Sequence, residues 1–132
     1  MNNEFFSRRE QFEQAFFSFA KALRVASENA DKQCEIMGFH NVAWEIRDDV
    51  NSGLYMLDVS DGFLSDAIQH SIREFVAAVN DLPDYIFSEA VSKKQNLESM
   101  RDPCWEAIRT QAHCLIEALQ GVEKNNKHFF GM

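Results

Sequence analysis

The chain has 132 residues, of which 45% are hydrophobic and twelve are Phe, so it is long and apolar enough to bury one core. We expect a single helical domain over residues 1–132, with a frayed tail over about 125–132. The formal net charge of -8 argues against direct nucleic-acid binding and against attachment to an anionic membrane, because both depend on basic residues.

Apolar residues recur at steps of three and four, which predicts an all-α fold: a mostly antiparallel bundle of four to five helices with a long N-terminal helix. The first helix is expected over residues 4–37, and at ~1.5 Å per residue it would be ~50 Å long. Each of the next two helices would span only ~27 Å. Three explanations stay open: the helix breaks near residues 27–31, it spans two partners stacked end to end, or it projects to meet another chain.

The second helix is expected to begin after a capping Asn41 and to continue to about residue 57. Its inward positions are Ala43, Ile46, Val50, Leu54 and Leu57. The Ser52-Gly53 pair weakens this helix by about 1 kcal/mol relative to Ala, and residues 54–59 taken alone resemble a strand. Because no other segment alternates convincingly enough to pair with such a strand, we predict a helix, with or without a kink.

The third helix follows the Asp61-Gly62 turn and runs to about Asn80, and Pro83 ends its pattern. A fourth, weaker helix is expected near residues 86–97. Its apolar positions are Ile86, Phe87, Ala90, Val91 and Leu97.

The Asp102-Pro103 pair predicts the start of a fifth helix, because a capping carboxylate precedes proline at the first helical position. The inward residues of this helix are Cys104, Ile108, Leu115, Leu119 and Val122.

The cellular location is predicted from features that are missing in the sequence. The three cysteines show no CxxC spacing, which suits free thiols in a reducing compartment. No apolar run approaches the ~18–20 residues of a membrane span, and the first residues do not resemble a signal peptide. We therefore expect a cytoplasmic protein.

The negative charge is concentrated in the middle third of the chain. Residues 38–82 contain eight Asp or Glu and two basic residues, whereas the segments on either side are each close to neutral. An acidic segment of this kind gives the folded molecule one negative side, which favours partners of the opposite sign.

Four side chains on the second helix share one face, roughly opposite its apolar positions: Trp44, Asp48, Asn51 and Tyr55, at i, i+4, i+7 and i+11. Trp and Tyr are enriched at binding hot spots because they bury much area while few torsions are frozen. We predict that Trp44 and Tyr55 anchor a protein partner and that Asp48 and Asn51 are polar contacts. The steering charges toward a basic partner would be Glu45, Asp49 and Asp66. The alternative is that another helix covers this face.

A metal site is a weaker alternative. Asp66, His70 and Glu74 follow i, i+4, i+8 spacing on the third helix, and His113 and Glu117 repeat this spacing on the fifth. Bundle metal sites need ligands that point inward from several helices, whereas these residues lie away from the apolar positions. We therefore expect no metal, no cofactor and no catalytic residue. The corresponding alternative is a metal- or nucleotide-dependent bundle enzyme.

Phe6 and Phe17 lie about a quarter turn from the main apolar stripe of the first helix. They either contact the fourth or fifth helix of the same chain or form a homodimer contact, which would make the protein a homodimeric helical scaffold.

Taken together, the sequence favours a non-enzymatic module that binds a basic protein through the acidic second and third helices. Inhibitors, immunity proteins and antitoxins are often small acidic domains of this kind, and the comparison is one of shape and charge.

Overall fold

The computed structural model describes residues 7–125, and every regular element in this range is helical. The elements are α1 (Arg8–Ser27), α2 (Ala30–Met37), α3 (Val42–Asp58), α4 (Asp66–Asn80), the 3₁₀ helix η2 (Asp84–Phe87), α5 (Lys93–Met100) and α6 (Trp105–Asn125). The all-α class is therefore confirmed. The expected count of four to five helices is wrong, because the described residues form six α-helices.

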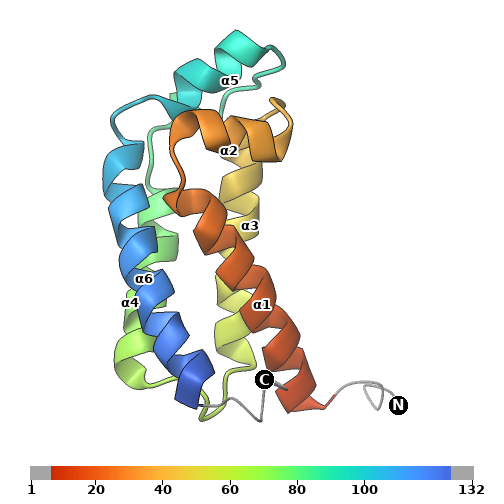
Figure 1. Ribbon diagram of the computed structural model, residues 1–132, viewed down its shortest axis with the longest axis vertical. Coiled ribbons are helices and arrows are strands. Elements are labelled where there is room, and N and C mark those ends of the chain that lie inside the picture. The colour runs from red at the N-terminus through yellow and green to blue at the C-terminus, as the bar shows by residue number, and fades with distance from the viewer. Residues whose placement is uncertain (1–6, 126–132) are drawn as a thin grey trace.

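The four long helices form the body of the molecule. α1 and α4 each pack against both α3 and α6, so every long helix has two long neighbours, which run antiparallel to it (Figure 1). The short helices α2 and α5 pack against each other across one end of this bundle (Figure 1). All six helices contribute buried residues to one hydrophobic cluster. Its largest fully buried side chains include Phe12, Phe16, Phe19, Phe75 and Trp105.

The long helix expected over residues 4–37 is broken. α1 begins after Ser7, where the Ser7 Oγ accepts from the Glu10 N–H and the Glu10 carboxylate accepts from the Ser7 N–H, both at 3.1 Å. Glu28 and Asn29 have extended backbone, and the Asn29 side chain accepts from the Lys32 N–H at 2.8 Å to begin α2. The break falls within residues 27–31, as in the first of the three explanations left open, and it accounts for the mismatch in helix lengths.

Arg109 of α6 closes this break. Its Nε donates to the Glu28 carbonyl at 2.9 Å, and its Nη2 donates to Gln33 Oε1 at 2.8 Å. The same Nη2 donates to the Met100 carbonyl at 2.6 Å. Burial lowers the pKa of Arg109 from its ordinary value, because the cation is removed from water. One side chain thus joins the ends of α1 and α5 to the start of α2.

α3 is helical throughout, and Gly53 has a packing role rather than a role in a strand. A Cβ added at Gly53 would lie 2.6 Å from Phe19 Cε1, so only glycine lets the ring of α1 approach this closely. The expectation that Leu54 points inward is wrong, because Leu54 is 48% exposed and the buried position beside it is Gly53. A glycine cannot be recognised as a core position from hydrophobic periodicity.

The expected capping role of Asn41 is also wrong. Asn41 has left-handed backbone (φ 46°), and its side chain makes no cap to α3. Instead, its Oδ1 accepts from the Ala90 N–H at 2.8 Å. The α3 terminus is served by the fully buried Asn96, whose Oδ1 accepts from the Val42 N–H at 2.9 Å. Asn96 Nδ2 also donates to the carbonyls of Phe39, Ala90 and Ser92.

The fourth helix expected near residues 86–97 is two elements. η2 ends at Phe87, and α5 begins after Ser92, which forms a capping box with Gln95. Val91, expected to be inward, is 60% exposed in the link between them. Asp102 Oδ1 accepts from the Cys104 N–H at 2.9 Å, as expected of a cap. α6 nevertheless begins at Trp105, two residues later than expected, because the Trp105 and Glu106 N–H groups donate to the Asp102 and Pro103 carbonyls in a tighter, i→i+3 turn.

Candidate binding face on the third helix

The outward side of α3 carries two large aromatic rings. Trp44 is 44% exposed and Tyr55 is 52% exposed, so no neighbouring helix covers either ring. The core side of the helix is turned toward α1 and α4, which leaves the Trp44 and Tyr55 side open to solvent. Exposed rings of this size are good anchors, since their burial by a partner removes much apolar surface from water.

Carboxylates surround these rings. Asp48 and Asp49 are exposed and Glu45 is half-buried, and none of the three forms an ion pair within residues 7–125. The pKa of Asp49 is raised from its ordinary value of 3.8, first by burial and then by the charges of Glu45 and Asp48. Lys21 of α1 opposes this shift only in part. This turn of α3 therefore carries negative charge that its own fold leaves uncompensated.

Beyond the other end of α3, the carboxylate of Asp61 is paired. Arg8 Nη2 pairs with Asp61 Oδ1 at 2.8 Å and also donates to the Asp58 carbonyl at 2.8 Å. The hydrogen bond from Arg8 lowers the pKa of Asp61. Asp66 is exposed at the first residue of α4, at the same end of the bundle as Tyr55. The unpaired carboxylates of α3 are thus concentrated toward its N-terminal half.

Asn51 links α3 to α4. Its Nδ2 donates to the Arg47 carbonyl at 2.8 Å and to Asn80 Oδ1 at 3.2 Å, while its Oδ1 accepts from Asn80 Nδ2 at 2.9 Å. Both amide hydrogens of Asn51 are therefore occupied. A partner could still donate a hydrogen bond to Asn51 Oδ1, which accepts only one from the described residues.

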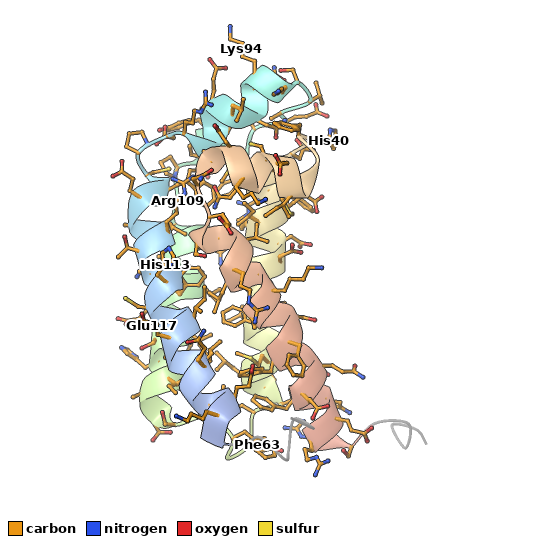
Figure 2. The ribbon with its side chains drawn as sticks, viewed as in Figure 1. His40, Phe63, Lys94, Arg109, His113 and Glu117 are labelled. Atoms are coloured by element: carbon orange, nitrogen blue, oxygen red, sulfur yellow. The ribbon has the colours of Figure 1, made fainter. Side chains whose placement is uncertain are left out.

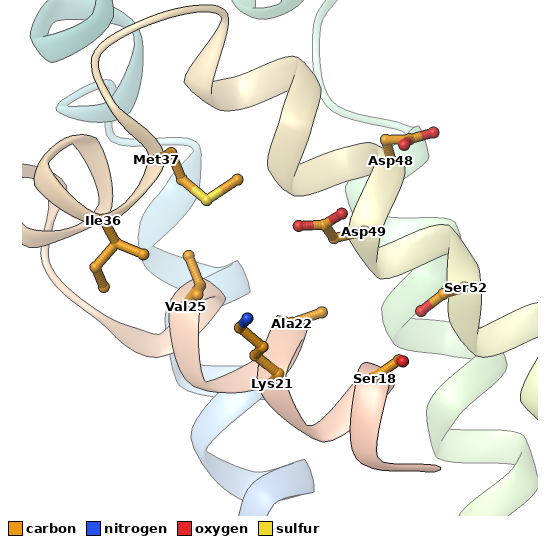
Figure 3. A pocket seen from close by; sticks show the side chains of 9 residues that line it. All are labelled: Ser18, Lys21, Ala22, Val25, Ile36, Met37, Asp48, Asp49 and Ser52. Carbon is orange, nitrogen blue, oxygen red and sulfur yellow. The ribbon is translucent and has the colours of Figure 1, made fainter. Parts of the chain in front are cut away.

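A groove runs beside the aromatic face, between α1 and α3. Its upper part is a depression of about 460 Å³, shown in Figure 3. The lining side chains are Ser18, Lys21, Ala22 and Val25 of α1, Ile36 and Met37 of α2, and Asp48, Asp49 and Ser52 of α3. A second depression of about 420 Å³ continues it toward Gln11, Gln14, Ala15 and Tyr55. Ser18 and Ser52 line both parts, so we treat them as one feature, the α1–α3 groove.

The hydroxyl of Ser52 is an exception to the rule that buried polar atoms are paired. Its Oγ exposes less than 1 Å² and has no hydrogen-bond partner among the described residues. An unpaired buried hydroxyl of this kind costs stability.

Sequence reasoning found the α3 side of this groove but missed its other wall. Trp44, Asp48, Asp49 and Tyr55 lie within four turns of one helix, so their relation follows from helical spacing. The α1 and α2 residues join them only through helix packing. One signal in the sequence could have indicated the α1 wall of the groove: the small side chains Ala15, Ser18 and Ala22, which recur at steps of three and four.

The residues of the metal alternative do not form a site in the described structure. His70 Nε2 lies 3.3 Å from Glu74 Oε2 on an exposed part of α4. His113 and Glu117 are exposed along α6, below Arg109 (Figure 2). No group of three or more His, Cys, Asp or Glu side chains within residues 7–125 is placed to hold a metal ion.

Of the two residues of the dimer alternative, Phe6 and Phe17, the structure describes Phe17. Phe17 is 41% exposed and its ring meets Phe16 edge-on, with centroids 5.8 Å apart. Phe6 lies outside the described residues.

Comparison with protein-family models, with curated proteins and with solved structures finds no match to this chain. Among the described helices, none combines the length and the apolar character that crossing a bilayer requires.

Proposed function

We propose that the protein is a non-enzymatic binding module that engages a basic protein partner through the outward face of α3. Trp44 and Tyr55 are the anchors in this proposal, and Asp48 and Asn51 are the polar contacts. Glu45, Asp49 and Asp66 attract the partner from a distance. The observation that carries the proposal is that two half-exposed rings and several unpaired carboxylates lie together on the outward side of α3.

The energetics of protein interfaces support this assignment. A few central aromatic residues usually account for most of the binding free energy, and surrounding charges mainly raise the association rate and select the partner. Uncompensated carboxylates on α3 would repel acidic proteins and attract basic ones. The class we have in view is the small acidic protein that covers a basic surface of an enzyme or a nucleic-acid-binding protein, as inhibitors, immunity proteins and antitoxins do.

The free thiols support a reducing environment for this activity. Cys34 is buried, Cys104 is half-buried and Cys114 is exposed, and none is in a disulfide. Burial, and then the hydrogen bond to Asp102, raises the pKa of Cys104 to about 12, so this thiol stays protonated. An exposed thiol such as Cys114 persists in the cytoplasm, where we place the protein.

The proposal is tested by capturing partners with the wild-type protein and with Trp44→Ser/Tyr55→Ser. Both substitutions are at exposed positions, so circular dichroism should show an unchanged fold. We expect the wild type to retain a basic protein, identified by mass spectrometry, that the double variant loses. Tyr85→Ser is the matched control, since Tyr85 is a 63% exposed ring in η2.

Two outcomes would count against the proposal. A partner that the double variant retains as well as the wild type binds elsewhere on the molecule. Loss of helical signal in the double variant would show that the rings stabilise the fold, and the binding comparison would then be repeated with Trp44→Phe/Tyr55→Phe.

A further inference from the structure

We infer that the α1–α3 groove seats one amphipathic α-helix of the basic partner, with the Lys or Arg side chains of that helix directed to the α3 wall. This inference rests on the proposed function and adds to it the place, the secondary structure and the orientation of the bound segment. The groove and the aromatic face are continuous, because Tyr55 and Asp48 belong to both.

The shape of the groove fits a helix. Ala15 and Ala22 line the groove and expose only 7% and 5% of their surface. Ser18 and Ser52, which line both parts, are also small and fill little of its width. Small side chains of this kind let another helix approach closely. The α1 wall extends from Gln11 to Val25, which is ~20 Å of helix, and so matches about four turns of a partner.

An extended peptide fits less well. The walls of the groove are helices whose backbone N–H and C=O groups are already paired within each helix. A strand laid in the groove would bury its own backbone groups without partners, whereas a helix pairs them internally.

The charges set the orientation. Asp48 and Asp49 stand on the α3 wall without ion pairs in the described structure, and Lys21 is the charged side chain lining the α1 wall. Basic side chains of the partner therefore belong on the α3 side, because the opposite placement would bring them to Lys21. The exposed Ile36 at one end and Tyr55 at the other offer apolar contacts along the same line.

The test uses designed peptides as probes. A 16-residue helical peptide carries Leu and Ala on one face and Lys along one flank. A second peptide has the same composition with the helical periodicity scrambled, and a third has Glu in place of Lys. Dissociation constants are measured for the wild type and Ser18→Arg, which places a long cation in the middle of the groove from an exposed position. Ser71→Arg, at an exposed serine of α4, is the matched control.

We expect the patterned Lys peptide to bind the wild type at least tenfold more tightly than the scrambled or Glu peptides. Ser18→Arg should weaken this binding at least tenfold, and Ser71→Arg should leave it within twofold. Asp48→Asn/Asp49→Asn provides a second variant, and it should weaken binding of the Lys peptide but not of the Glu peptide, which the two carboxylates repel.

The inference is overturned if Ser18→Arg binds the patterned peptide like the wild type, or if the scrambled peptide binds equally well. Absence of binding by all peptides also overturns it. If Trp44→Ser/Tyr55→Ser loses a captured partner while Ser18→Arg retains it, the α3 face is the site and the groove is not, so the proposed function survives alone. A wild-type dimer that Ser18→Arg dissociates would assign the groove to a second copy of the chain.

Discussion

At the scale of single residues, Gly53 of α3 packs directly against the Phe19 ring of α1. In an open helix, glycine to alanine would add about 1 kcal/mol of stability. Here the new methyl group would lie 2.6 Å from an atom of the fully buried Phe19 ring, so the ring would have to move within the core. We predict that Gly53→Ala lowers the free energy of unfolding by about 1–2 kcal/mol, measured by urea denaturation, since overpacking exceeds the gain in propensity.

Gly121 provides the matched control. It is an exposed residue of α6, and a Cβ at this position meets nothing within 4 Å. Gly121→Ala should therefore stabilise the protein by up to about 1 kcal/mol. If both substitutions stabilise, the tight contact between Phe19 and Gly53 is not a feature of the protein in solution.

Asp49 is a residue whose proposed role in binding comes at a cost to stability. Its pKa is raised in the fold, so the folded state binds the proton more tightly than the unfolded state does. Stability therefore falls as the pH rises from the ordinary pKa of 3.8 through the raised value. Asp49→Asn should raise the free energy of unfolding at pH 7 by up to about 1 kcal/mol, and this gain should shrink as the pH approaches 3.8.

Thermal or urea unfolding of the variant at several pH values measures this effect. Glu117→Gln removes an exposed carboxylate of α6 and controls for the general benefit of a lower net charge. If Asp49→Asn gains no more than Glu117→Gln at pH 7, the carboxylate cluster on α3 carries no stability cost.

At the scale of elements, the sequence predicts what is local and misses what depends on distant contacts. The Asp61-Gly62 turn was predicted, and a break between α1 and α2 was one of three explanations left open, because capping residues and turn chemistry lie within a few positions of each boundary. The start of α3 was assigned to the wrong side chain. Asn41 has the right residue type for a cap, yet the acceptor that serves this terminus is Asn96, 54 positions away.

Asn96 therefore holds three segments together. It accepts from the N–H of Val42 and donates to the carbonyls of Phe39, Ala90 and Ser92. Asn96→Ala leaves these buried groups without their partner, and we predict a loss of about 2–3 kcal/mol of unfolding free energy, measured by urea denaturation.

Gln111→Ala, at an exposed position of α6, should change the stability by less than about 0.5 kcal/mol. A similarly small loss for Asn96→Ala would mean that water or other groups replace the side chain, and that it does not hold the loops in place.

At the scale of the whole molecule, the fold places the acidic middle third of the chain mainly on the adjacent helices α3 and α4. α1 supplies the wall of the α1–α3 groove that faces α3. The aromatic and acidic residues of α3 could be predicted together because they share one helix. The groove could not be predicted, because it depends on how α1 and α2 pack beside α3, which hydrophobic periodicity does not reveal.

The central claim is that α3 binds a basic partner, and nuclear magnetic resonance with the captured partner tests it most directly. The protein has two Trp, each with its own indole N–H signal. Trp105 is fully buried and donates to the Ser99 carbonyl at 3.0 Å, so its signal is an internal control. On titration we expect the Trp44 indole and the amides along α3 to shift while the Trp105 indole stays in place. Shifts confined to α4, α5 or α6, with the Trp44 indole unmoved, would contradict the account.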